Sequence, residues 1–197
     1  LFCARAPSML TAYTRLRTML PTSYKGGAMY SDVIIIGGGF AGTAAAITLA
    51  RANRNIQLID SGAPRNRFSD HAHGILGLDG VSPTELLERG HAEVNKFGGA
   101  ITHATVESLS RPSEQAPWQV SLTDGTLLES RHVLVATGLT DKLPEVPGLS
   151  DLWGTRLFHC PYCHGHEVRG RRLRSLAARI RLLLSALANC FLSGRAL

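Results

Sequence analysis

Two cysteines separated by two residues carry the most reactive chemistry in this 197-residue sequence, within the decapeptide FHCPYCHGHE. Thiols at this spacing can close a small disulfide, and a helix that begins at the pair lowers the pKa of the first thiol, which must be a thiolate to attack. His159, His164 and His166 add nearby proton-transfer groups, and His164 is the best placed for acid–base work on the thiolate if the loop folds back toward the pair. The segment predicts a redox-active pair, Cys160 and Cys163, with His164 as proton-transfer partner.

Four other interpretations of this decapeptide compete with the redox pair. Cys-Pro-Tyr-Cys is also the glutaredoxin active-site tetrapeptide, although that fold needs a further strand and helix after it. Cys-x-x-Cys-His is the c-type haem attachment pattern, which requires a secreted context. Zinc could take the two cysteines and two histidines, but structural zinc generally uses two separated ligand pairs. The fourth interpretation is a structural disulfide or a pair of thiols without a function. We favour the redox pair and expect no metal.

A glycine-rich turn is the second feature that could do chemistry. Residues 32–36, DVIII, are typical of a short buried parallel strand, and GGGFAG follows at once. The first glycine permits the tight turn, the third lets backbone approach a pyrophosphate, and the last lets the next helix pack closely on the sheet. The helix expected over residues 41–52 would direct its N-terminal amides at the phosphates. We expect the cofactor to contact Gly37, Gly39, Phe40, Ala41 and Gly42.

The next predicted strand, residues 56–59, ends in a carboxylate. Asp60 lies 18 residues beyond Gly42, where an acidic side chain accepts hydrogen bonds from ribose hydroxyls, and Ser61 follows it. A carboxylate there repels a 2′-phosphate, which disfavours NADP and leaves FAD or NAD. The glycine pattern alone does not separate these two.

A long, polar, glycine-punctuated segment over residues 61–80 is expected to be a binding loop rather than a short crossover. Arg65 and Arg67 are expected near the pyrophosphate, with solvated surface charge as the alternative. No metal partners converge in sequence on His71 and His73, so we interpret both as hydrogen-bonded loop residues.

A helix with clear boundaries comes next and helps to position these groups. Ser82 is its expected N-cap, Pro83 its first residue and Glu85 the reciprocal capping-box side chain, while Gly98-Gly99 ends it. Its apolar face is expected to be core packing without a further function, and consists of Leu86, Leu87, Val94 and Phe97.

A strand, a hairpin and a returning strand are predicted after this helix. They cover residues 101–109, 118–122, 127–128 and 132–136, with the turn of the hairpin at Asp124-Gly125. The returning strand runs into Ala136-Thr137-Gly138, whose small side chains would let backbone come close to the bound nucleotide.

The β-α-β unit, the meander and Ala136-Thr137-Gly138 together resemble the first FAD-domain segment of the low-molecular-weight thioredoxin reductase type, over about residues 29–170. The resemblance implies an α/β fold: a Rossmann-like, three-layer β/β/α FAD/NAD(P)-binding fold, incomplete, with a β-meander insertion. It implies an FAD-dependent pyridine nucleotide-disulfide oxidoreductase, with NAD(P)H as the second cofactor of the intact family. By the same resemblance, Cys163 would face the flavin and Cys160 would exchange with substrate.

One departure from this family concerns the substrate. Thioredoxin reductases carry Asp after the second cysteine, whereas this sequence has His164. Cys-Pro-Tyr-Cys-His-Gly is more similar to thioredoxin-reductase-like dithiol oxidases, some of which act on small dithiol natural products with oxygen. The expected partner is therefore a small-molecule or protein dithiol or disulfide, and a homodimer is compatible with the resemblance. A non-catalytic nucleotide-binding remnant and an NAD-binding module are the alternatives.

The distribution of charge and of apolar residues limits which other classes of function are possible. The formal charge of +6 comes from the ends, because residues 1–28 carry four basic side chains and residues 168–197 carry seven, with no acid in either. The middle is mildly acidic, which argues against a nucleic-acid-binding face. The sequence contains no run of about 18 apolar residues, so it predicts no membrane-spanning helix. We expect a cytoplasmic protein with no membrane or nucleic-acid partner.

The same compositional shifts suggest a division of the chain. We expect a non-native extension or a leader over residues 1–28, and the first segment of an FAD-binding domain over 29–143. Residues 144–170 would be a linker and the start of a pyridine-nucleotide domain, because a Pro/Gly-rich connection precedes the cysteines. Residues 171–197 are expected to be an aberrant tail, with a basic amphipathic helix as the alternative. The second glycine pattern, which would bind NAD(P)H, is missing.

Overall fold

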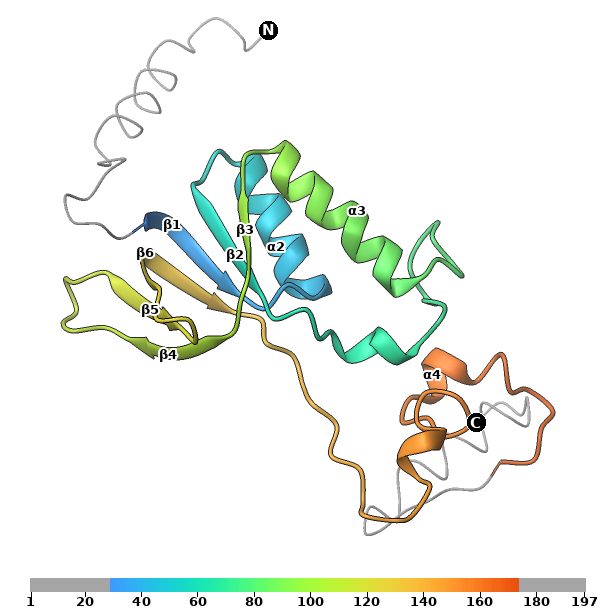
Figure 1. Ribbon diagram of the computed structural model, residues 1–197. Helices are drawn as coiled ribbons and strands as arrows, with labels where there is room; N and C mark the ends of the chain where they lie inside the picture. Colours follow the sequence, from blue (N-terminus) through green and yellow to red (C-terminus); the bar gives the residue numbers. More distant parts are fainter. Residues whose placement is uncertain (1–28, 174–197) are drawn as a thin grey trace, which may run out of the picture. The chain divides into compact units, whose positions relative to one another are not determined.

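The computed structural model describes residues 29–173, and its main feature is a single six-stranded sheet (Figure 1). The strand order is β3-β2-β1-β6-β5-β4. The first four of these pair in parallel, whereas β4 and β5 pair with their neighbours antiparallel. The strands are β1 (Met29–Ile36), β2 (Ile56–Asp60), β3 (Ala100–His103), β4 (Val106–Ser110), β5 (Trp118–Leu122) and β6 (Leu127–Val135). The expectations for residues 1–28 and 174–197 lie outside the described residues.

Side chains of the central strand alternate between two apolar clusters, which makes the fold three-layered. Ile34 and Ile36 of β1 pack with residues of β5 and β6, whereas Ile35 packs on the opposite face. There it meets residues of helices α2 (Phe40–Arg51) and α3 (Pro83–Lys96). Successive strand side chains point to opposite faces, so one buried strand supplies both clusters. The predicted β/β/α arrangement is confirmed.

One local expectation was wrong. The strand predicted over residues 101–109 is two strands, since β3 pairs with β2 and β4 pairs with β5. Ala104 and Thr105 separate them and bond to Asp60 and Thr123, so the chain leaves one strand pairing and enters another. At the start of α3, Glu85 pairs with Arg89 one turn later, and the capping-box role expected of Glu85 stays a prediction.

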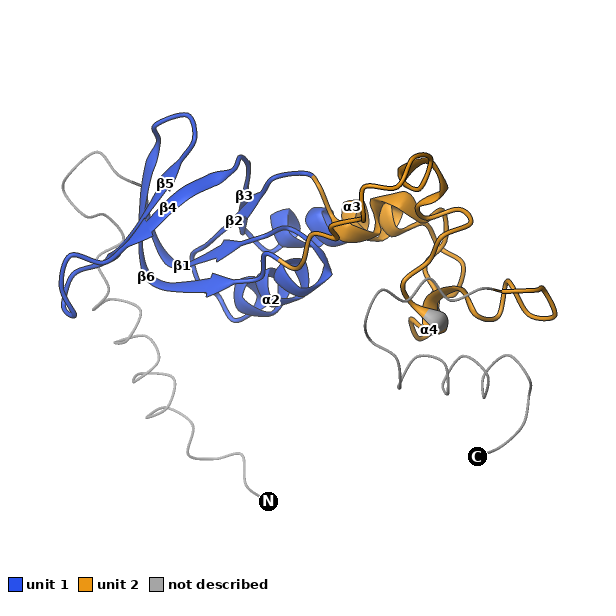
Figure 2. Ribbon diagram, turned by 90° about the horizontal axis from the view of Figure 1, so that it is seen from below, with its two compact units in different colours: residues 1–62, 90–137 blue, residues 63–89, 138–197 orange. Residues whose placement is uncertain are grey.

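The chain divides into two compact units (Figure 2). In the described part of the chain, unit 1 comprises residues 29–62 and 90–137, which include all six strands. Unit 2 comprises residues 63–89 and 138–173 and has only short elements besides the start of α3. These are η1 (Arg65–Phe68), η2 (Ser150–Leu152) and α4 (Pro161–His164). The expected domain boundary at residue 143 is a different division and stays a prediction.

Among residues 29–173, none of the helices combines the length and the apolar character that crossing a membrane requires.

Candidate functional site

The glycine turn between β1 and α2 leaves no room for side chains at its two ends. Gly37 has φ +110°, and a Cβ there would overlap the Ala136 carbonyl. A Cβ on Gly42 would overlap the Gly37 carbonyl, because the first turn of α2 packs directly on the end of β1. Gly39 is different, since nothing lies within 4 Å of where its Cβ would be. The turn is therefore tight where it meets the protein and open at Gly39, as the close approach of a diphosphate requires.

The N-terminus of α2 lacks the partners that usually satisfy a helix end. Its N-cap, Gly39, makes no side-chain capping bond, and the first turn holds no acidic residue. Phe40 and Ala41, which open the helix, are exposed. The free amides and the positive end of the helix dipole therefore suit an anion.

Asp60 lies at the end of β2, directly against the glycine turn. A Cβ on Gly38 would overlap the Asp60 side chain, so the middle residue of the three glycines is also restricted. One Asp60 carboxylate oxygen accepts a hydrogen bond from the backbone N–H of Gly62 at 3.0 Å. Within residues 29–173, no hydrogen bond joins another protein group to the second oxygen, Oδ2. Ser61, the neighbouring predicted residue, is exposed.

The small residues after β6 meet the glycine turn only in part. The Ala136 N–H donates to the Ile36 carbonyl at 2.8 Å, which holds Ala136 beside Gly37. Thr137 is the last residue of this stretch in unit 1, and Gly138, with φ +68°, is the first in unit 2. The predicted run thus lies at a junction of the chain, with Ala136 and the Cα atom of Thr137 packed against Gly37.

Two arginines, Arg65 and Arg67, are predicted to lie near the pyrophosphate, and the first of them is paired with an acid inside unit 2. Arg65 Nε and Nη2 donate to the two Asp141 carboxylate oxygens at 2.7 and 2.6 Å. The hydrogen bonds from Arg65 lower the pKa of Asp141 below its usual range. Arg67 lies over the Phe68 ring, 4.2 Å from its centroid, and donates to the Pro64 carbonyl. Sequence reasoning missed Asp141, which is 76 positions from its partner.

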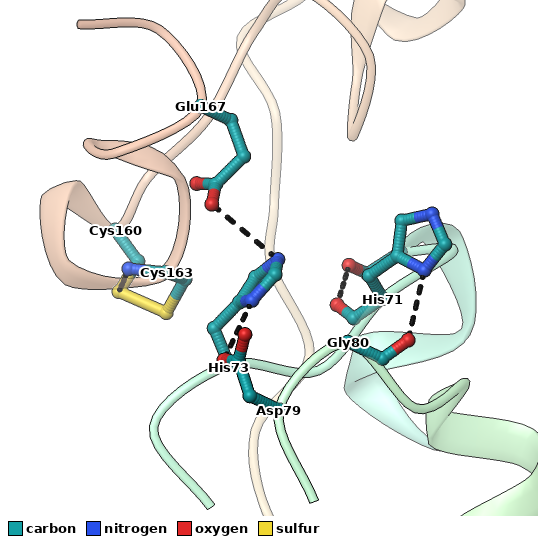
Figure 3. A network of polar contacts seen from close by, with 8 residues as sticks. His71, His73, Asp79, Gly80, Cys160, Cys163 and Glu167 are labelled. Atoms are coloured by element: carbon teal, nitrogen blue, oxygen red, sulfur yellow. Dashed lines mark hydrogen bonds and ion pairs between the residues drawn. A yellow bond between two sulfur atoms is a disulfide. The ribbon is translucent and has the colours of Figure 1, made fainter.

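The cysteine pair is joined as a disulfide at the short helix α4 (Figure 3). Cys160 immediately precedes the helix, and the Cα atoms of Cys160 and Cys163 are 5.4 Å apart. The backbone N–H of Cys163 donates to the Cys160 sulfur at 3.2 Å. In the reduced protein a donor in this position stabilises a Cys160 thiolate. Cys163 is exposed and Cys160 is half-buried.

His164 follows the second cysteine and keeps its ring partly out of water. The ring stacks on Phe158, with centroids 4.2 Å apart. Within the described residues its Nδ1 atom is buried and has no hydrogen-bond partner. Burial is the main reason that the pKa of His164 is lowered, and the negative charge of Glu167 opposes this effect. A lowered pKa favours the neutral imidazole near neutral pH, and the proton-transfer role expected of His164 stays a prediction.

Two histidines of the 61–80 loop make local hydrogen bonds in unit 2 (Figure 3). His71 Nδ1 contacts the Gly80 carbonyl at 3.1 Å, and His73 Nδ1 contacts an Asp79 carboxylate oxygen at 3.0 Å. The expectation that both are hydrogen-bonded loop residues is confirmed. His73 Nε2 also lies 3.5 Å from a Glu167 carboxylate oxygen, a contact that sequence reasoning missed. In residues 29–173, no group of three or more His, Cys, Asp or Glu side chains could hold a metal ion.

Comparison with known proteins gives consistent similarities. A family model described as pyridine nucleotide-disulphide oxidoreductase matches residues 31–177. The chain is 34% identical over 141 residues to the thioredoxin reductase tcpT of Claviceps purpurea, covering 71% of this chain and 44% of that protein. It is 32% identical over 156 residues to the thioredoxin reductase sirT of Leptosphaeria maculans, covering 78% of this chain and 48% of that protein.

Solved structures give the same result. The crystal structure of HlmI matches with a TM-score of 0.69 and 46% identity, covering 75% of this chain and 46% of that one. The oxidoreductase from Agrobacterium tumefaciens matches with a TM-score of 0.67 and 40% identity, covering 71% of this chain and 47% of that one. The chain thus spans about half the length of the curated relatives and solved structures that it matches.

Proposed function

Because this chain belongs to the pyridine nucleotide-disulphide oxidoreductase family, we propose that it is an FAD-dependent thiol–disulfide oxidoreductase of the thioredoxin reductase-like type. In this proposal electrons pass between FAD and the Cys160–Cys163 pair. The observation that carries it is the disulfide itself, which lies at the start of α4 and is followed directly by the half-buried His164. A disulfide that is only structural has no need of a neighbouring proton acceptor.

The glycine turn and the end of β2 would hold the FAD diphosphate and ribose. Gly39 and the uncapped start of α2 offer backbone amides to the diphosphate, and Asp60 has an oxygen free for the ribose. When bound, FAD supplies the two-electron exchange with the cysteine pair. We also assign cofactor contacts to Gly37, Phe40, Ala41, Gly42, Ser61, Arg65, Ala136, Thr137 and Gly138.

The cysteine pair would exchange with a dithiol substrate in two displacements. A substrate thiolate attacks Cys160 Sγ, which forms a mixed disulfide and breaks the Cys160–Cys163 bond. Cys163 leaves with the electron pair as a thiolate. The second substrate thiol then displaces Cys160, so the substrate is released as a disulfide and the protein holds two reduced sulfurs. His164 takes the proton of the attacking thiol and returns it to the leaving sulfur. Two electrons and two protons pass from substrate to the pair, and the reverse sequence reduces a disulfide.

We propose a small-molecule dithiol as substrate, with a protein dithiol as the competing class. Support comes from the tetrapeptide and His164, which resemble dithiol oxidases rather than the Asp-bearing thioredoxin reductases. We place the reaction in the cytoplasm. NAD(P)H and oxygen are the two candidate redox partners for FAD in this chain, which spans about half of its relatives' length.

The test is the flavin spectrum of the purified protein under argon. We expect FAD absorbance that bleaches on addition of dithiothreitol in the wild type and persists in the Cys160→Ser/Cys163→Ser double variant. Equal bleaching in both would refute electron transfer through the pair. Bound FAD with no bleaching in either protein would indicate a non-catalytic nucleotide-binding remnant. A protein that binds NAD in a thermal-shift assay and has no flavin spectrum would be an NAD-binding module.

A further inference from the structure

The carbonyl of Gly38, in the middle of the glycine turn, accepts two side-chain hydrogen bonds. Thr43 Oγ1, one turn into α2, donates to it at 2.9 Å. A ring nitrogen of His91, Nε2, lies 3.2 Å from the same oxygen, and His91 is 53 residues away in the sequence. Since a carbonyl only accepts, this nitrogen carries the proton. Neither side chain belongs to the glycine pattern, and neither was singled out from the sequence.

The contact between the two helices explains how His91 comes to the turn. A Cβ on Gly90 would lie 2.7 Å from Thr43 Cγ2, so the absence of a side chain at residue 90 lets α3 lie close to α2. One turn later, Val94 is fully buried in the cluster between the helices and the sheet. Close packing at both positions fixes the side of α3 from which His91 projects, and the donor reaches the turn from a rigid element.

Fixing this carbonyl also fixes the direction of the next amide. In a trans peptide the C=O of one residue and the N–H of the next point in opposite directions. The Gly38 carbonyl is directed at Thr43 and His91, so the Gly39 N–H is directed away from them. Gly39 is also the residue of the turn with open space beside it. An amide held in advance toward an anion loses less conformational freedom on binding.

We propose that His91, together with Thr43, is a positioning residue that orients the Gly38–Gly39 peptide so that the Gly39 N–H faces the diphosphate of a bound dinucleotide. The proposal rests on the proposed function for the identity of that ligand, FAD. His91 does not touch the ligand in this proposal, and it acts through one backbone carbonyl. Its neutral and protonated forms both donate, so the effect does not require a change in its charge.

The test compares three variants of the whole chain, with a matched control on a neighbouring histidine. His91→Phe keeps a ring and removes the donor, whereas His91→Gln keeps a donor. His103, on β3, has its ring centroid 6.4 Å from that of His91, so His103→Phe is the control for changing a histidine in this region. Thermal unfolding of each variant checks that the fold is retained.

The first measurement is the Gly39 amide in the protein without ligand, by NMR chemical shift and hydrogen exchange. We expect it to shift and to exchange faster in His91→Phe, and to stay near its wild-type values in His91→Gln and His103→Phe. The second is the FAD dissociation constant. Loss of one such hydrogen bond should weaken binding by about 3- to 10-fold in His91→Phe, with His91→Gln within about twofold of wild type.

An unchanged Gly39 amide in His91→Phe would overturn the proposal, as would equal loss of affinity in His91→Phe and His103→Phe. If the wild-type protein bound no FAD, the proposed function would fail by itself. The Gly39 amide would still decide whether His91 orients the peptide, so the two failures are distinguishable.

Discussion

His164 is expected to stay neutral at pH values where an ordinary histidine is half protonated. Burial lowers its pKa, and the negative charge of Glu167 partly offsets this. Removal of that charge in Glu167→Gln should therefore lower the pKa of His164 further. An NMR titration of the His164 ring in both proteins measures this, and an upward shift in Glu167→Gln would contradict it.

The lowered pKa of His164 also makes the free energy of unfolding depend on pH. The unfolded chain binds the proton at higher pH than the folded chain, so folding stability is complete above the ordinary histidine pKa of 6.5 and decreases as the pH falls below it. His164→Gln should have a smaller loss of stability over this window. Urea unfolding of wild type and variant between about pH 7.5 and 5 makes the comparison.

Two glycines of the turn should respond differently to a single methyl group. In Gly42→Ala the added Cβ overlaps the Gly37 carbonyl, so we expect a loss of about 1–3 kcal/mol in the free energy of unfolding, because backbone must move. Gly39 has φ −69°, which any residue adopts, and open space beside it, so Gly39→Ala should fold like wild type and lose FAD affinity. Urea unfolding and FAD titration of both variants test the distinction, and FAD binding by Gly39→Ala at wild-type affinity would contradict it.

At the scale of elements, the 61–80 loop is linked to the later part of unit 2 by specific side-chain pairs. Arg65 bonds to Asp141 with two hydrogen bonds, and the hydrogen bonds from Arg65 lower the pKa of that carboxyl. Arg65→Gln removes this link. Arg67→Gln is the matched control, because the polar and ring contacts of Arg67 in the described part of the chain are with its neighbours Ala63, Pro64 and Phe68. Limited proteolysis should therefore cut the loop faster in Arg65→Gln than in wild type, and Arg67→Gln should resemble wild type.

The sequence predicts elements well where their signals are local. The strand over residues 32–36, the glycines after it and Asp60 lie within one β-α-β unit, and the structure has each element in place. The strand predicted over residues 101–109 was wrong because its two halves have different partners, β2 and β5, and alternation of side chains does not reveal a change of partner.

The long-range polar contacts of the candidate site could not be predicted from the sequence, and the reason is physical. Asp141 and Glu167 are ordinary charged residues in their local sequence, and only the fold brings them to Arg65 and His73. His91 reads as a polar position on an amphipathic helix, and its contact with Gly38 depends on the close approach of α3 to α2 at Gly90. Residue type predicts which groups can react, whereas tertiary packing decides which of them meet.

At the scale of the whole molecule, the apolar clusters and the disulfide belong to different units. The described core consists of two apolar clusters on the two faces of the unit 1 sheet. The disulfide belongs to unit 2 and joins residues only three apart in sequence. A loop this short removes little freedom from the unfolded chain, about 2 kcal/mol at most. We therefore expect that opening the pair leaves the sheet intact, as the proposed redox cycle requires.

This separation predicts different responses to reduction and to a core mutation. Trp118 lies on β5 and reports on the sheet in a Trp153→Phe background. Dithiothreitol should leave its urea transition unchanged, as should the Cys160→Ser/Cys163→Ser variant, because neither touches the clusters. Ile35→Ala should cost about 2–5 kcal/mol, since Ile35 is fully buried between the sheet and the helices. If reduction abolished the Trp118 transition, the disulfide would be part of what holds the sheet together, and a structural role for the cysteines would be the better interpretation.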